Sequence, residues 1–144
     1  MARLTAEDVG SWLLKSTRPP AVIDPGWAPG QTRELSRCVR SSYRLLLMSP
    51  GQPVLLWISG RVDPGVHAVG TVVSGPVPGE GGPTVAVRLT RLAEPVPRAL
   101  LLADPRARDA EVLRMPAGSN PSYLTPDQHA AVLDELATPG AART

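Results

Sequence analysis

Three tryptophans are the side chains of this 144-residue sequence most able to bind a ligand. Trp27 lies in a loop rich in proline and poor in other apolar anchors, so we expect its ring to stack on a ligand rather than fill the core. Trp12 and Trp57 fit core packing and ligand contact equally well. An aromatic wall with arginines nearby suits unstacked nucleic-acid bases, because the rings stack on bases and the guanidinium groups hold phosphates.

Smaller polar residues could read the edge of such a base. Asp24 lies in the same loop as Trp27 and could accept from an exocyclic amino group or form an Asx-turn before Pro25. Ser59 could hydrogen-bond a base edge or simply end a strand. Asn120 precedes a proline, and a turn role is favoured for it.

The spacings of common catalytic motifs are missing. The sequence has no HExxH, GxSxG, P-loop, CxxC or GxGxxG pattern. Its two histidines, His67 and His129, are too few to predict a metal site, so we expect no metal, no cofactor and no catalytic residue. Cys38, between Arg37 and Arg40, is either a reactive thiolate or a small core residue, and the core role is favoured.

A central β-hairpin is expected to position these groups. Two apolar, β-branched runs at residues 54–58 and 66–73 flank a polar loop, which predicts a long hairpin over residues 53–74. Its near-continuous hydrophobicity predicts cover on both faces, as in a small closed or half-closed barrel. Gly65 and Gly70 mark places where another backbone approaches closely.

The rest of the chain predicts short strands and few helices. Further strands are expected at residues 11–16, around Val39, at 84–92 and at 111–115. Helices are expected as one turn at 5–9, at 41–48 and at 125–137. In the last helix Thr125 and Gln128 would form a capping box, with Val132, Leu133 and Leu136 facing inward. Residues 17–31 predict a long loop without regular structure.

Composition favours one compact domain over residues 1–138, followed by a flexible tail at 139–144. The formal charge is +2, and the basic residues are fourteen arginines and Lys15. A single cysteine excludes an internal disulfide, and a reduced cytoplasm is the expected compartment. The first residues include Glu7 and Asp8 and lack a long apolar core, so we expect no signal peptide; the other apolar runs are too short for a membrane span.

The order of several motifs resembles the EVE domain family. These motifs are WLLKS, IDPGW, LMSPGQPVLLWISG, GVHAVGTVVSGPV and NPSYLTPDQ, and together they span nearly the whole chain. EVE domains are PUA-like barrels related to the YTH and ASCH families. The resemblance therefore implies an α/β protein of the α+β type, a PUA-like β-barrel of five or six mixed strands with about three flanking helices.

The resemblance also implies a site that binds nucleic acid, with one modified base inserted in an aromatic pocket. In bacteria, EVE-like modules are associated with sensing modified DNA in restriction systems, or with RNA modification. Carried over, Trp27 is the stacking wall, Trp57 and Ser59 line the pocket, and Asp24 matches an acidic loop position. The remaining base-binding candidates are Lys15 and Ser16, which match the strand end beside the ligand, and Trp12.

The sequence thus predicts a non-catalytic reader of a modified base, such as methylated or hydroxymethylated cytosine. Four arginines would hold the nucleic-acid backbone: Arg18, Arg40, Arg44 and Arg114. A methyl group would add about 1 to 2 kcal/mol of preference. DNA is favoured over RNA, an effector such as a nuclease is an expected partner, and the chain is expected to be a monomer.

Two other functions remain open. An RNA- or nucleotide-modifying enzyme would need Asp24, His67 or Cys38 near the mouth of the pocket. A protein-interaction module without a nucleic-acid role would have buried tryptophans and scattered arginines.

Overall fold

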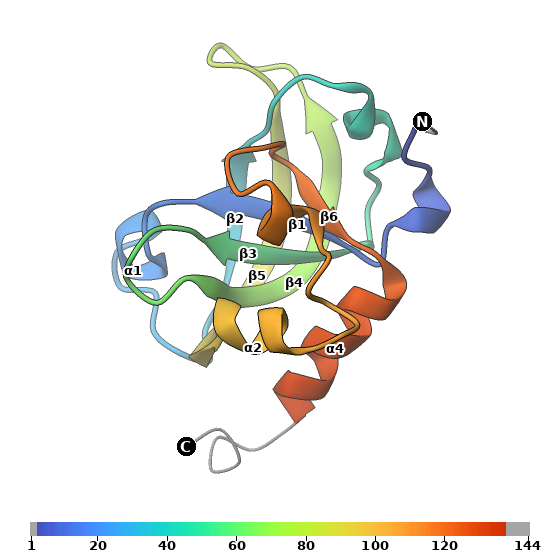
Figure 1. Ribbon diagram of the computed structural model, residues 1–144. Coiled ribbons are helices and arrows are strands. Elements are labelled where there is room, and N and C mark those ends of the chain that lie inside the picture. The colour runs from blue at the N-terminus through green and yellow to red at the C-terminus, as the bar shows by residue number, and fades with distance from the viewer. Residues whose placement is uncertain (1–2, 138–144) are drawn as a thin grey trace.

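The computed structural model describes residues 3–137 and forms one six-stranded mixed sheet with short helices around it (Figure 1). The strand order is β2-β5-β4-β3-β1-β6; β1 and β3 are parallel and the other neighbours antiparallel. The strands are β1 Ser11–Ser16, β2 Thr32–Cys38, β3 Pro53–Ile58, β4 Gly65–Val77, β5 Thr84–Pro97 and β6 Ser122–Leu124. The predicted α+β class with six mixed strands is confirmed, and the sheet is not closed because β2 and β6 are its edges.

Helical segments lie between the strands and on either side of the sheet-forming part of the chain. They are the 3-10 helices η1 Ala6–Asp8 and η2 Tyr43–Leu47, and the α-helices α1 Pro20–Ile23, α2 Arg98–Ala103, α3 Glu111–Arg114 and α4 Pro126–Ala137. The predicted tail at residues 139–144 lies outside the described residues.

The central hairpin is confirmed. β3 and β4 pair antiparallel from Pro53 opposite Thr71 to Ile58 opposite Gly65. A Cβ atom on Gly65 would overlap the backbone carbonyl of Val96, and one on Gly70 would overlap that of Arg88. Both glycines therefore let β5 pass close to β4, as their positions in the sequence predicted.

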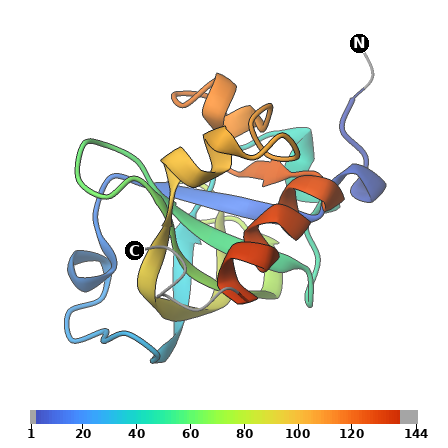
Figure 2. The same cartoon turned by 60° about the horizontal axis from the view of Figure 1, so that its bottom comes forward.

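The sheet is buried on both faces, which explains the continuous apolar runs of its central strands. On β1, Trp12 and Leu14 belong to one buried cluster and Leu13 to the other, as the alternation of a strand requires. The first cluster includes Trp27, and the second includes residues of α2, α3 and α4. Figure 2 shows α4 lying across the sheet.

The last third of the chain differs from the expectation. Residues 111–115 were expected as a strand, but Glu111–Arg114 form the helix α3, and a strand for which none was expected, β6, follows at Ser122–Leu124. β6 pairs antiparallel with β1, with Ser11 opposite Leu124. Three residues are too few to show a strand periodicity, so only this tertiary pairing makes β6 a strand.

The local signal was read correctly at the start of α4. The Thr125 N–H donates to Gln128 Oε1 at 2.9 Å, and the Gln128 N–H donates to Thr125 Oγ1 at 3.3 Å, so the capping box is confirmed. The inner stripe was partly wrong, because Leu133 is 48% exposed and Ala131 is buried instead. In η2, Ser42 Oγ accepts from the Arg44 N–H at 3.2 Å as the N-cap.

Two further expectations are corrected in the first half of the chain. Residues 17–31 do contain regular structure, because α1 begins at Pro20, and proline is tolerated at the first position of a helix. The edge strand expected around Val39 is β2, which ends at Cys38. Cys38 is exposed rather than a core residue, because the alternation along β2 turns its side chain outward.

Candidate nucleic-acid interface

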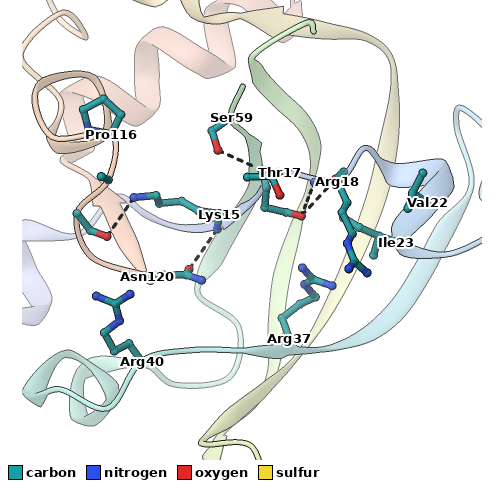
Figure 3. Close-up of a pocket in the computed structure, with 13 residues that line it drawn as sticks. Lys15, Thr17, Arg18, Val22, Ile23, Arg37, Arg40, Ser59, Pro116 and Asn120 are labelled. Atoms are coloured by element: carbon teal, nitrogen blue, oxygen red, sulfur yellow. Dashed lines mark hydrogen bonds between the residues drawn. The ribbon is translucent and has the colours of Figure 1, made fainter. Parts of the chain in front are cut away.

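A pocket of about 750 Å³ lies where the two edges of the sheet approach each other (Figure 3). Near this gap the Arg40 N–H donates to the Asn120 carbonyl oxygen at 2.7 Å, which ties the end of β2 to the loop before β6. The end of β1, α1, β2, Ser59 after β3 and the loop at 116–120 supply its walls. Its lining residues are Lys15, Ser16, Thr17, Arg18, Val22, Ile23, Arg37, Arg40, Ser59, Pro116, Ala117, Gly118 and Asn120.

The pocket is cationic. Lys15, Arg18, Arg37 and Arg40 line it, and the lining contains no aspartate, glutamate or aromatic side chain. Within the described residues, none of the three arginines forms an ion pair. Because like charges gather there without a carboxylate, the pocket is suited to an anionic ligand.

Lys15 and Asn120 are fixed against each other. The Lys15 backbone N–H donates to Asn120 Oδ1 at 3.1 Å, and Lys15 Nζ donates to the Gly118 carbonyl at 3.2 Å. Because the N–H requires an acceptor, this contact fixes the orientation of the Asn120 amide and leaves its NH₂ group without a partner among the described residues. Burial lowers the pKa of Lys15, the charge of Glu111 raises it, and that of Arg40 lowers it further.

Hydroxyl groups hold the end of β1 in place. Ser16 Oγ accepts from the Arg18 N–H at 3.0 Å, and Ser59 donates to the Ser16 carbonyl through its N–H at 2.9 Å and through Oγ at 3.4 Å. Both serines line the pocket. Five residues proposed from the sequence therefore lie around one cavity: Lys15, Ser16, Arg18, Arg40 and Ser59.

The three tryptophans lie in the core instead. Trp27, expected to be poorly placed for packing, is 1% exposed and belongs to the first buried cluster, so that expectation was wrong and the ring offers no open face. Its Nε1 donates to the Gln31 carbonyl at 2.8 Å, which satisfies the indole within its own loop. Trp12 and Trp57 are equally buried and do not line the cationic pocket.

Three polar residues proposed for nucleic-acid contact lie outside the pocket. Asp24 accepts from Arg33 Nε at 3.0 Å, so its carboxylate is engaged in an ion pair rather than facing a base. Arg114 is exposed on α3, and its Nε donates to the Asp109 carbonyl at 2.8 Å. Arg44 forms a mostly buried pair with Glu111 and does not line the pocket, so its guanidinium is engaged by a carboxylate rather than free for a phosphate.

The Arg44 and Glu111 pair holds one wall of the pocket. The guanidinium donates to both carboxylate oxygens, at 2.8 and 2.6 Å, and to the Pro121 carbonyl at 3.1 Å. Burial alone would raise the pKa of Glu111, but the hydrogen bonds from Arg44 and Ser122 hold that pKa below its ordinary value. The pair thereby anchors the loop that carries Gly118 and Asn120.

Arg37 was missed as a site residue, although the sequence held a signal for it. Arg33, Leu35 and Arg37 occupy alternate positions on β2 and are all half-buried, so Arg37 shares the inward face with an apolar residue. Burial lowers the pKa of Arg37, the charge of Cys38 raises it, and that of Arg18 lowers it. Asn120 was assigned a turn role, and nothing local indicated that its amide would meet Lys15.

The described residues bring no group of three His, Cys, Asp or Glu side chains together. A ring nitrogen of His67, Nε2, lies 2.6 Å from the Asp63 carbonyl oxygen, and His129 is on α4. No helix in the described part of the chain is both long and apolar enough to cross a lipid bilayer.

No protein-family model and no curated protein matches this chain. Solved structures share its fold. A hypothetical protein from Leishmania major is 20% identical, with a TM-score of 0.67 and coverage of 90% of this chain and 96% of that one. A protein from Pseudomonas syringae is 13% identical, with a TM-score of 0.66 and coverage of 87% and 98%.

A third neighbour is the human THYN1 protein in complex with DNA containing 5-methylcytosine. It is 18% identical, with a TM-score of 0.56 and coverage of 90% of this chain and 98% of that one. At these identities the comparisons establish the fold alone, an α+β fold with one six-stranded mixed sheet.

Proposed function

We propose that this chain is a non-catalytic nucleic-acid-binding module of the EVE type that takes one extruded base into its cationic pocket. The observation that carries the proposal is the pocket itself: four cations and no carboxylate line a cavity of about 750 Å³. The neighbour of the same fold that was solved with 5-methylcytosine DNA supports it. DNA is the proposed nucleic acid, and an effector such as a nuclease is the proposed partner of the module.

In this mechanism arginines take the place of an aromatic wall. Arg18 and Arg40 are exposed at the rim and would contact phosphates. Arg37 is half-buried, and its planar guanidinium can stack on a base. Val22 and Ile23 of α1 supply apolar contact on another side. The aperture between the sheet edges would admit a base only after it has left its stack, as in other proteins that extrude bases.

Fluorescence polarisation with labelled single- and double-stranded oligonucleotides at two salt concentrations tests nucleic-acid binding. Arg40→Gln should weaken binding about three- to tenfold and reduce the salt slope by about 0.7 to 0.9, because one phosphate contact is lost. Arg88→Gln is the matched control, since Arg88 on β5 is 54% exposed, does not line the pocket and carries the same charge. Equal effects of the two variants, or no binding at low salt, would overturn the proposal.

The fluorescence of 2-aminopurine measures base extrusion separately from binding. An oligonucleotide carrying 2-aminopurine should brighten on binding if the fluorescent base leaves its stack. Arg37→Gln should reduce this signal at saturating protein, because the group proposed to stack on the base is gone. If the oligonucleotide bound but its fluorescence did not rise at any position of the 2-aminopurine, the protein would bind only the nucleic-acid backbone. Base extrusion would then be excluded.

A further inference from the structure

The polar groups that face the pocket are mainly hydrogen-bond donors. Arg18, Arg37, Arg40 and Lys15 carry only donors on their side chains. Asn120 has the same character here, because its Oδ1 already accepts from the Lys15 N–H and its NH₂ group has no partner in the described structure. The Gly118 carbonyl is engaged by Lys15 Nζ at 3.2 Å. The serine and threonine hydroxyls are the remaining acceptors on these side chains.

Two of the cations are also partly removed from water. Lys15 and Arg37 are half-buried, and burial lowers the pKa of each. Arg18 and Arg40 add like charge beside them. A cation that has lost part of its hydration gains most from an anion at hydrogen-bond distance, and no carboxylate of the pocket lining supplies one.

The apolar part of the lining is open to solvent. Val22 is 55% exposed, and the other apolar members are Ile23, Pro116 and Ala117, the last two also exposed. A methyl group gains free energy by leaving water for an enclosed apolar surface, which this pocket provides only in part. An exocyclic amino group would likewise meet few free acceptors.

Resting on the proposed function, we infer that the pocket recognises an anionic group on the extruded nucleotide rather than a methyl group. Lys15, Arg37 and the Asn120 amide form the recognising set. Two parts of a nucleotide can present such a group: a carboxylate on the base, as in 5-carboxylcytosine, or the phosphate beside it. The donor set binds both by the same charge-assisted hydrogen bonds.

The test compares oligonucleotides that differ at one position. That position carries cytosine, 5-methylcytosine or 5-carboxylcytosine, and a fourth oligonucleotide has cytosine with a neutral methylphosphonate at the adjoining linkage. A base-borne anion predicts that 5-carboxylcytosine binds about tenfold tighter than 5-methylcytosine, the effect of one charge-assisted hydrogen bond. A phosphate ligand predicts equal binding of the three bases and a loss of about tenfold with the methylphosphonate.

Three variants with the same change in net charge connect the effect to the pocket. Asn120→Asp keeps the acceptor for the Lys15 N–H but replaces the free NH₂ group by an anionic oxygen, so it should abolish the tenfold difference. Arg37→Gln should reduce that difference about threefold or more. Arg88→Gln lowers the net charge equally at an exposed site on β5 and should leave the difference intact. Thermal melting of each variant checks that it is folded.

The outcomes separate this inference from the proposed function. Tighter binding of 5-methylcytosine than of 5-carboxylcytosine, with 2-aminopurine brightening intact, would overturn the inference and leave base extrusion standing. The inference would also be overturned if the tenfold difference in affinity, whether caused by the carboxylate or by the phosphate, remained in Asn120→Asp and Arg37→Gln. In that case the two pocket variants would behave like the control Arg88→Gln. Absence of binding to all four oligonucleotides would instead overturn the proposed function.

Discussion

The loop between β1 and β2 has two halves with opposite chemistry. In the second half, polar groups bind one another: Asp24 pairs with Arg33, Trp27 Nε1 donates to the Gln31 carbonyl, and Arg91 donates to the Trp27 carbonyl. In the first half, Arg18 lines the pocket and forms no ion pair within the described residues. The anchored second half holds the first half in position. We therefore expect substitutions in the second half to change mainly the stability of the protein, and substitutions in the first half to change mainly its binding of nucleic acid.

The largest effect is expected from removing the Trp27 ring, which tests whether the second half of the loop serves stability rather than binding. Trp27→Ala should lower the free energy of unfolding by about 3 to 5 kcal/mol, because a fully buried ring leaves a cavity. Urea denaturation followed by circular dichroism measures the loss. Oligonucleotide affinity per folded molecule should stay within about twofold, which corresponds to about 0.4 kcal/mol, because Trp27 does not line the pocket. If Trp27→Ala were stable but no longer bound the oligonucleotide, Trp27 would have to be assigned to the ligand site.

On the opposite wall of the pocket, the Arg44 and Glu111 pair also anchors a loop by polar contacts. Arg44→Gln should cost about 2 to 4 kcal/mol of stability, because it leaves a mostly buried carboxylate without its partner. Urea denaturation at neutral pH again reports the change. The exposed pair of Arg88 and Glu34 provides the control, and Arg88→Gln should cost at most about 1 kcal/mol. Similar losses in both variants would contradict the structural role of the Arg44 pair.

A smaller effect is expected at the Asp24 and Arg33 pair. Both side chains are about one-third exposed, at 33% and 34%, so solvent screens their attraction. Asp24→Asn should therefore lower stability by at most about 1 kcal/mol. Binding should persist, because Asp24 does not line the pocket. If Asp24→Asn changed the preference between bases with little loss of stability, the carboxylate would belong to the site after all.

The smallest effect concerns the protonation of His129. Burial lowers the pKa of His129, and its Nδ1 is buried without a hydrogen-bond partner among the described residues. The folded protein therefore binds this proton less readily than the unfolded chain. The resulting stability is fully present above the unfolded pKa, near 6.5, and falls as the pH drops through that value toward the lowered one.

Melting temperatures between pH 5 and 8 measure this dependence. His129→Gln should flatten the acid side of the profile relative to the parent chain. His67→Gln serves as the control with the same loss of one histidine, because His67 lies beside the Asp63 carbonyl on β4. An unchanged acid limb in His129→Gln would show that carboxylates, and not His129, cause the loss.

Sequence patterns predicted those elements whose signals are local. The paired apolar runs predicted the β3–β4 hairpin, and the Thr125 and Gln128 capping box predicted the start of α4. The signals failed where an element is too short for a period to show. α3 has four residues and β6 has three, and their types depend on packing against the sheet and on pairing with β1.

The candidate site was predicted in part for a related reason. Lys15, Ser16 and Ser59 line one pocket because they lie at the ends of neighbouring strands, and parallel pairing brings Ser16 opposite Ile58. Trp27 was expected outside the core because its loop is rich in proline, whereas core packing had remained open for Trp12 and Trp57. Trp27 packs in the first buried cluster, and its indole N–H donates to the Gln31 carbonyl four residues later, which offsets the cost of burying that polar group.

By itself, the sequence determined the alternation of apolar residues, the hairpin, the capping of α4 and the excess of arginine over other cations. Tertiary structure decided which arginines are neutralised and which are not. Arg44 meets Glu111 from 67 positions away, whereas Arg37 and Arg40 line the same pocket as Lys15 and Asn120. Charge pairing depends on distances between segments far apart in the chain, and only the folded sheet sets those distances.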